Sequence, residues 1–126
     1  MVGSEDWSVD WLMVYIEEAH ANDEWPVRSG RYVPDGKPVE IEQPKTTERR
    51  VEVCKEFLGT YGVPTDGAMS VVVDSPEAGN PFEKAFAPWP VRMYVIEDGK
   101  MEFISAPTEC SHNVGDLRAW LEQRFK

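Results

Sequence analysis

Two short, mainly apolar runs, each ending at a carboxylate, are the first signal in the chain. Residues 11–16 end at Glu17 and Glu18, and residues 69–73 end at Asp74. Both runs are short and consist mainly of bulky apolar side chains, many of them β-branched, a composition typical of strands inside a sheet. We therefore expect two buried strands whose carboxyl-terminal ends emerge at acidic residues.

Apolar positions spaced three to four residues apart predict a helix after Pro44. Thr46 or Thr47 can cap its start, because a threonine hydroxyl accepts a hydrogen bond from a free amide of the first turn. Gly59 and Gly62 are expected to end it. The predicted apolar face of this helix consists of Val51, Cys54, Phe57, Leu58 and Tyr61.

A second, short helix is predicted from Asn80 to about Ala87. Asn80 suits the N-cap, Pro81 the first helical position and Glu83 the first turn. A terminal helix is expected from a cap at Asn113. It runs through Phe125, with an apolar stripe formed by Val114, Leu117, Trp120 and Leu121.

A β-hairpin is predicted where two further strand segments, residues 92–96 and 101–104, flank the dipeptide Asp98–Gly99. Asp-Gly is a strong signal for a tight hairpin turn. By contrast, the stretch from His20 to Pro44 shows no sustained period and is divided by prolines and glycines, with short hairpin arms possible at residues 31–33 and 39–41. A loop of this length inside a compact domain is usually functional.

The order of these elements predicts a mixed α/β sheet flanked by helices, with the closing hairpin as antiparallel edge strands. A length of 126 residues suits one domain, residues 1–126. The formal charge of −10 argues against nucleic acid and against an anionic membrane as partners. No apolar run reaches the roughly 18 residues that a membrane span needs, and no signal peptide precedes residue 11, so we expect a soluble, cytoplasmic protein.

Cysteine and histidine are too few for a metal centre or a disulfide framework. Cys54 and Cys110 are 56 positions apart without a Cys-x-x-Cys motif, and the two histidines are His20 and His112. We therefore expect two free thiols and no bound metal. Cys54 lies on the predicted apolar helix face, where burial raises the pKa of a thiol. Cys110, just before the terminal helix, is the other thiol to consider as a nucleophile.

Four blocks of the sequence, in order, resemble the iodothyronine deiodinases. Residues 14–20, Val-Tyr-Ile-Glu-Glu-Ala-His, followed by Asp23-Glu24-Trp25, resemble a family strand that ends in Tyr-Ile-Glu-Glu-Ala-His and is followed by Asp-Gly-Trp. Residues 71–74 resemble its Val-Val-Val-Asp strand, residues 87–96 its Ala-Pro-Arg-Leu-Tyr-Val-Ile segment, and residues 118–122 its last helix. The entry into the first helix at residues 43–46 is most similar to microbial members.

The resemblance implies a thioredoxin-like fold of the peroxiredoxin type and an oxidoreductase that removes iodine reductively from an aromatic ring, as in thyroid hormone metabolism. It implies no bound cofactor, only an external thiol reductant. In the family, a cysteine or selenocysteine nucleophile lies in a strand–helix unit before the histidine motif. No cysteine precedes that motif here. We therefore expect a fragment or truncated relative that lacks the first strand–helix unit and is inactive alone.

The candidate catalytic residues are His20, Glu17 and Glu18, and the candidate substrate-binding residues are Trp25 and Arg92. The resemblance makes His20 the histidine that contacts the phenol end of the substrate, although a structural hydrogen bond to a neighbouring glutamate or to the backbone is the alternative. Only one of the two glutamates can serve it, because neighbours on a strand face opposite sides. Trp25 can stack on an aromatic ligand or cover an edge of the core.

Arg92 occupies a family arginine position near the reactive centre. Its alternative role is an ion pair with Asp74 or Glu83. In the predicted sheet, residues 12–16 and 71–73 are parallel neighbours, whereas residues 92–96 and 101–104 form a separate antiparallel pair. Unpaired strand edges also make a homodimer possible.

Two hypotheses follow. The first is a deiodinase-like oxidoreductase domain whose nucleophile segment is missing from this chain. The second is a non-enzymatic, thioredoxin-like module that binds a small aromatic ligand or a protein partner.

Overall fold

The structure, a computed structural model, describes residues 7–26, 40–65, 67, 69–106 and 113–126. The chain divides into two units, which are treated separately below. One is Trp11–Trp89, and the other, the hairpin unit, combines Met1–Asp10 with Pro90–Lys126. Both contain helix and strand, so the chain is mixed α/β as predicted, with two small sheets and three helices among the described residues.

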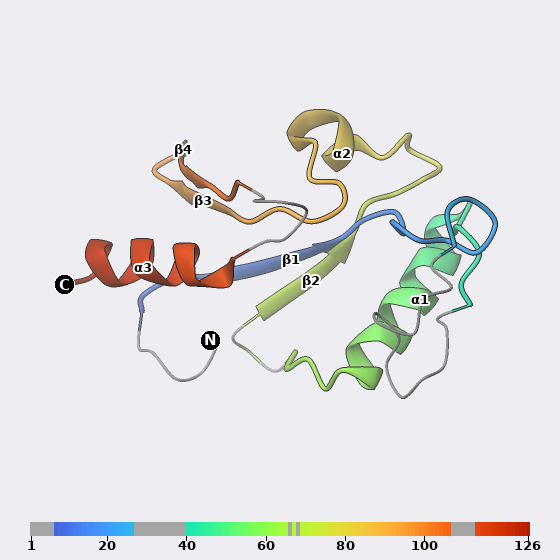
Figure 1. Cartoon of the computed structure of the whole chain (residues 1–126), viewed down its shortest axis with the longest axis horizontal. Helices are drawn as coiled ribbons and strands as arrows, with labels where there is room; N and C mark the ends of the chain where they lie inside the picture. Colours follow the sequence, from blue (N-terminus) through green and yellow to red (C-terminus); the bar gives the residue numbers. More distant parts are fainter. Residues whose placement is uncertain (1–6, 27–39, 66, 68, 107–112) are drawn as a thin grey trace. The chain divides into compact units, whose positions relative to one another are not determined.

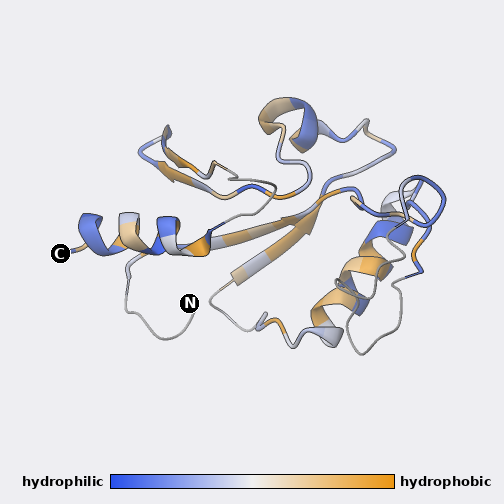
Figure 2. Ribbon diagram, viewed as in Figure 1, coloured by the Kyte–Doolittle hydropathy of each residue, from blue (hydrophilic) through white to orange (hydrophobic). Residues whose placement is uncertain are grey.

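The Trp11–Trp89 unit is built on a parallel pair of strands, β1 (Trp11–Tyr15) and β2 (Met69–Val73). The two strands lie side by side (Figure 1), and their register pairs Trp11 with Met69 and Tyr15 with Val73. This confirms the predicted parallel neighbours, with β1 one residue shorter than expected. Both strands are mainly hydrophobic, as Figure 2 shows.

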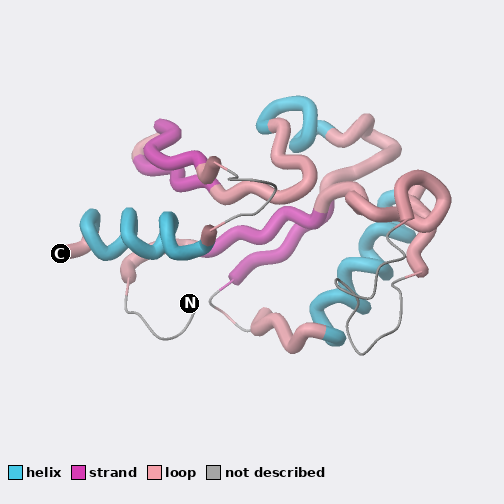
Figure 3. The backbone as a smooth tube through the Cα atoms, in the orientation of Figure 1, coloured by secondary structure: helices cyan, strands magenta, loops and turns pink. Residues whose placement is uncertain are grey.

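Helix α1 (Thr47–Thr60) connects the two strands and contacts β2. The predicted threonine cap is confirmed: the Thr46 hydroxyl accepts from the amide of Arg49 at 3.1 Å. The helix ends at a cap residue, Tyr61, and Gly62 follows with φ +60°, a left-handed conformation that glycine adopts without strain. The chain leaving β1 and the chain entering α1 are both irregular (Figure 3).

The buried side of α1 differs from the predicted apolar face. Val53 and Cys54 are buried, but so is the charged Arg50, whereas Tyr61 is 52% exposed. Phe57 packs against Tyr15 of β1, with ring centroids 5.6 Å apart. The buried face of the helix is therefore rotated toward Arg50. This charged side chain can be buried because it finds hydrogen-bond acceptors there, which the spacing of apolar residues does not reveal.

Helix α2 (Pro81–Phe86) follows β2 and has proline in its first turn, as predicted. The predicted side-chain cap at Asn80 is wrong, since Asn80 lies at φ 52° and its side chain does not bond the helix amides. Asp74 does so instead. Its two carboxylate oxygens accept from the amides of Phe82 and Glu83, both at 2.9 Å. An anion placed at a helix start is favoured by the helix dipole.

The hairpin unit contains β3 (Tyr94–Glu97), β4 (Lys100–Ile104) and α3 (Val114–Arg124). The strands are antiparallel, and Asp98 and Gly99 both have positive φ at the turn between them, which confirms the predicted hairpin. The predicted Asn113 cap is also confirmed, because its side chain accepts from the amide of Gly115 at 2.8 Å.

The predicted stripe of α3 is only partly correct. Leu117 and Leu121 are buried, and Trp120 packs near Phe103 of β4 with ring centroids 6.3 Å apart. Val114 is 49% exposed and contributes little to the core. The two sheets share no ladder hydrogen bonds within the described ranges, in line with the predicted separate pairs. The hairpin arms expected at residues 31–33 and 39–41 lie mostly outside the described residues.

None of the helices in the described ranges combines the length and the hydropathy that a membrane crossing would need.

Candidate functional site

The carboxyl-terminal ends of β1 and β2 lie at one edge of the sheet, because the strands are parallel. The amide of Asp74 donates to the carbonyl oxygen of Tyr15 at 2.9 Å, which continues the ladder one residue past the end of β2. Glu17 and Glu18 therefore leave the sheet on the same side as Asp74. Ligand sites of open α/β sheets lie at such edges.

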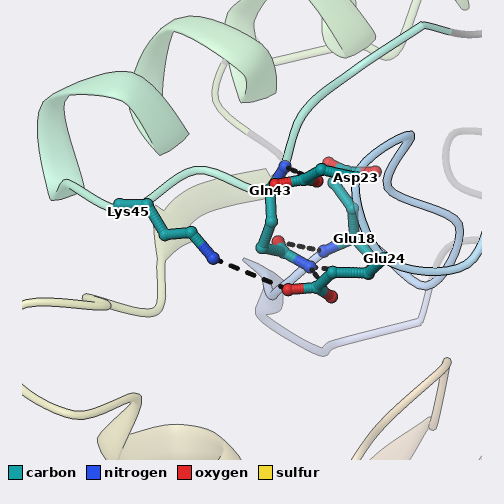
Figure 4. A network of polar contacts seen from close by, with 5 residues as sticks. All are labelled: Glu18, Asp23, Glu24, Gln43 and Lys45. Atoms are coloured by element: carbon teal, nitrogen blue, oxygen red, sulfur yellow. Dashed lines mark hydrogen bonds and ion pairs between the residues drawn. The ribbon is translucent and has the colours of Figure 1, made fainter.

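Gln43 holds the turn that follows β1 (Figure 4). Its side-chain amide pairs with the backbone of Glu18 in both directions: the Glu18 amide donates to Oε1, and Nε2 donates to the Glu18 carbonyl, each at 2.9 Å. The Gln43 backbone amide donates to Asp23 Oδ1 at 2.8 Å. Gln43 is 6% exposed, so these groups are desolvated and their hydrogen bonds are costly to lose.

Two further contacts complete this Gln43 network. Nε2 of Gln43 also donates to Glu24 Oε2 at 3.0 Å, and Lys45 Nζ lies 3.6 Å from Glu24 Oε1. Both the Glu24 and the Lys45 side chains are largely exposed, so the ion pair is worth little by itself. The buried amide pairing, rather than the ion pair, fixes the turn over residues 18–24.

His20 and Trp25 lie together on this turn. His20 Nδ1 is 3.2 Å from the carbonyl oxygen of Trp25, and the two ring centroids are 4.7 Å apart. Both side chains are exposed. A carbonyl oxygen can only accept, so Nδ1 is the protonated nitrogen and the neutral ring has its lone pair on Nε2.

Glu18 does not serve as the partner of His20. Its carboxylate accepts a hydrogen bond from the Tyr15 hydroxyl. Burial, followed by the hydrogen bond to Glu18 and its charge, raises the pKa of Tyr15 well above its ordinary value. Among the described residues, neither Glu17 nor Glu18 forms an ion pair with His20, whose hydrogen-bond partner there is the Trp25 carbonyl.

A buried arginine, Arg50, bonds to the residues that follow β2 at this edge of the sheet. Arg50 is 1% exposed, and one of its terminal nitrogens donates to the Asp74 carbonyl at 2.7 Å and to Asn80 Oδ1 at 2.6 Å. Its Nε is buried without a hydrogen-bond partner among the described residues. Burial lowers the pKa of Arg50, and the negative charges of Glu17 and Asp74 oppose that shift. Arg50 therefore balances the carboxylates at this edge of the sheet.

Glu83 belongs to the same group of charges. Its Oε2 is buried without a hydrogen-bond partner in the described part of the chain. Burial raises the pKa of Glu83, and the charges of Glu17 and Asp74 raise it further, while a hydrogen bond from the backbone of Trp89 lowers it. The site thus contains a carboxyl group that holds a proton more readily than an ordinary glutamate.

Arg92 lies in the hairpin unit, just before β3. Its Nε is buried, with no hydrogen-bond partner among the residues described. Asp74 and Glu83 belong to the other unit, so the expected ion pair with Arg92 stays a prediction. The structure thus brings four of the five predicted site residues into one unit.

Of the two thiols, the structure describes that of Cys54. Cys54 is free and 3% exposed, and burial, with the charge of Glu18, raises the pKa of its thiol. A protonated, inaccessible thiol is a poor nucleophile. Cys110 lies outside the described residues. Within the described ranges, no three histidine, cysteine or acidic side chains converge as metal ligands would.

Sequence reasoning missed Gln43, Arg50 and Trp89. Trp89 is 39% exposed and stacks near Trp25, with ring centroids 6.4 Å apart and planes inclined by 30°. The sequence shows Trp89 as a tryptophan between two prolines, but nothing in it indicates a contact with Trp25, 64 positions away. The only sequence signal for Gln43 was its position next to Pro44 in the long irregular stretch.

Comparison with known proteins gives a consistent result. The family model for iodothyronine deiodinase matches residues 2–125. Thyroxine 5-deiodinase from Homo sapiens is 30% identical over 115 residues, which cover 91% of this chain and 33% of the relative. The Sus scrofa protein of the same name is 31% identical over the same coverage. Type II iodothyronine deiodinase from Rattus norvegicus is 26% identical over 92% of this chain and 41% of its own length. The chain therefore spans between a third and two-fifths of these relatives.

Proposed function

Because the chain belongs to the iodothyronine deiodinase family, we propose that it forms the substrate-contacting part of a reductive dehalogenase acting on an iodinated aromatic ring. We further propose that β1–α1–β2 and the β3–β4 hairpin with α3 are parts of one thioredoxin-like domain, residues 1–126. The parallel pair joined by a helix and the hairpin followed by a helix support this fold.

The observation that carries the proposal is the state of His20. Its Nδ1 is engaged by the Trp25 carbonyl, and its ring is exposed at the edge where β1 ends. Nε2 of the neutral ring can therefore accept a hydrogen bond from a phenol hydroxyl, and the protonated ring can donate one to a phenolate. This is the role that the resemblance implies for His20.

The other proposed roles follow from position. Glu17 is the carboxylate left to act on a ligand or a proton near His20, since Glu18 is bonded to Tyr15 and Gln43. Trp25 offers a 61% exposed indole beside His20 as a binding surface. Arg92 is proposed to bind an anionic part of the substrate, supported by its buried and unpartnered Nε within the described chain.

The proposed net reaction replaces a ring C–I bond by C–H. It consumes one proton and two electrons and releases iodide, and two external thiols supply the electrons as they join in a disulfide. No bound cofactor takes part. The step requires a thiolate or selenolate nucleophile, and Cys54 is unsuited to that role because it is buried and its pKa is raised. We therefore expect no turnover by these 126 residues alone.

The alternative is a non-enzymatic module that binds a small aromatic ligand or a protein partner. Two observations favour it: the described thiol is inert, whereas the exposed His20–Trp25 pair can bind without any nucleophile. A homodimer, formed through strand pairing, also stays a proposal.

The test measures binding and turnover on the same samples. With thyroxine and a dithiol reductant, we expect no iodide release, but measurable thyroxine binding that His20→Gln weakens about fivefold to tenfold, because one hydrogen bond is lost. Asn22→Ala is the matched control, an exposed change two positions away that leaves binding intact. Iodide release that Cys110→Ser abolishes would show that the chain contains its own nucleophile. Absence of thyroxine binding would contradict both the enzymatic and the ligand-binding proposals.

A further inference from the structure

Trp25 and Trp89 form a continuous aromatic surface next to His20, here called the tryptophan surface. The indole centroids are 6.4 Å apart, and the centroid of His20 is 4.7 Å from that of Trp25. The two tryptophans remain 61% and 39% exposed. Exposing two large aromatic side chains side by side leaves apolar area in water that a ligand could cover.

The backbone holds Trp89 in place. It lies between Pro88, which is buried, and Pro90, and both prolines restrict the local backbone angles. Ala87, just before this segment, has φ 48°, a left-handed conformation that is narrow for a residue with a side chain. A side chain on such a restricted segment loses little conformational entropy when a ligand binds to it.

The chemistry around this surface selects among flat ligands. The chain has a formal charge of −10, so the nucleobases of a phosphate polyanion are disfavoured. His20 Nε2 supplies a hydrogen-bond acceptor beside the Trp25 indole, because Nδ1 donates to the Trp25 carbonyl. An aromatic ring that carries no phosphate and has one phenol oxygen matches both features.

We propose that Trp89 is a specificity-determining residue: together with Trp25 it stacks on an iodinated phenol ring, while His20 hydrogen-bonds the phenol oxygen, accepting from a hydroxyl or, when protonated, donating to a phenolate. This inference rests on the proposed function and adds to it a residue from the α2–β3 connection. Iodine is large and polarisable, so an iodinated ring gains more dispersion contact with an indole face than an unsubstituted ring does.

The experiment measures binding of 3,5-diiodo-L-tyrosine and of L-tyrosine to the full chain by calorimetry. Trp89→Leu keeps an apolar side chain but removes the aromatic face, and we expect it to weaken diiodotyrosine binding about fivefold. Trp89→Phe should restore binding to within about twofold of the original. Phe86→Ala is the matched control, because Phe86 is 38% exposed against 39% for Trp89 and is absent from the tryptophan surface; it should leave the affinity unchanged.

Each other outcome is informative. Diiodotyrosine binding that Trp89→Leu leaves unchanged overturns the role of Trp89 and leaves the proposed function standing. Equal binding of tyrosine and diiodotyrosine, both sensitive to Trp89→Leu, keeps the stacking surface but removes the preference for an iodinated ring, and with it support for the proposed function. Binding of neither ligand overturns the inference. A change of oligomeric state in Trp89→Leu, measured by sedimentation, also overturns it, because the surface would then bind a second copy of the chain.

Discussion

The two units of the chain are stabilised by different means. In the Trp11–Trp89 unit the buried residues include Arg50, Asp74 and Gln43 beside Val53 and Cys54, and each of the three polar ones makes several hydrogen bonds. In the hairpin unit the described buried residues are Leu117, Leu121 and one polar residue, Ser105, and the ion pairs Arg124–Glu97 and Arg118–Glu122 lie at the surface. The first unit therefore depends on specific long-range polar contacts, the second on local turn and helix signals.

The difference matters for function, because the candidate site belongs to the unit with the buried polar network. Hydrogen bonds to buried charged groups are costly to break and fix one arrangement of the segments that they join. The site segments after β1, after β2 and around α2 all contact Arg50, Asp74 or Gln43. Substitutions in the two units should therefore differ in their effect on stability.

The largest effect is expected for Arg50→Met. Methionine keeps much of the volume but leaves the Asp74 carbonyl and Asn80 Oδ1 without their donor and the nearby carboxylates without their cation. We expect the free energy of unfolding to fall by about 3 kcal/mol, because two hydrogen bonds from a charged group are lost and their acceptors stay desolvated. Urea denaturation measures it. Arg49→Met, an exposed neighbour that pairs with Glu52, is the control and should cost under about 1 kcal/mol. Equal losses would show that the network does not set this unit apart.

A smaller effect, of opposite sign, is expected for Glu83→Gln. The pKa of Glu83 is raised in the folded chain, so its contribution to stability is fully present below about pH 4.3, the ordinary glutamate pKa, and is lost as the pH rises through the raised value. Glutamine has no charge to bury, so the variant does not lose this stability as the pH rises. We expect the variant to be more stable at pH 7 by about 1 kcal/mol and unchanged near pH 4.

The control for this pH comparison is Glu102→Gln, which removes one negative charge from an exposed position on β4. It separates the local effect of burying a carboxylate from the general effect of lowering a net charge of −10. A gain of the same size in both variants would mean that the burial of Glu83 is irrelevant.

The smallest effect is expected in the hairpin unit, for Arg124→Gln. The guanidinium of Arg124 holds the pKa of the Glu97 carboxyl below its ordinary value, through a hydrogen bond and its charge. The pair therefore helps stability above the ordinary carboxyl pKa and stops doing so as the pH falls through the lowered one. Both groups are exposed, so we expect the melting temperature to drop by at most about 2 °C in low salt and not at all in 1 M salt. A drop that persists in high salt would show that the hairpin unit depends on this contact.

Local signals predicted most of the secondary structure. The Asp98–Gly99 turn, the caps at Thr46 and Asn113 and the parallel pairing of β1 with β2 were all recognisable, because each depends on a few neighbouring residues or on family resemblance. The Asn80 cap failed for a physical reason. Asp74, six positions earlier, supplies a charged acceptor to the same amides, and a charged acceptor bonds more strongly than a neutral amide.

The candidate site was predictable only in part. His20 and Trp25 are close in sequence, and their contact follows from one short turn. Gln43 and Trp89 reach the same turn from 25 and 64 positions away, where neither periodicity nor composition contains information. The burial of Arg50 was not predicted, since an arginine on a helix is ordinarily exposed.

The pairing of Gln43 with Glu18 also has an engineering consequence. Together with the hydrogen bond from the Asn22 amide to the Ile41 carbonyl at 2.7 Å, this pairing connects the segment before residue 27 to the segment after residue 39. A segment whose ends are tied in this way can be lengthened at a small entropic cost, about 0.6 kcal/mol for each doubling. A change in the length of chain between residues 26 and 40 should therefore leave the histidine turn in place, because Gln43 fastens that turn.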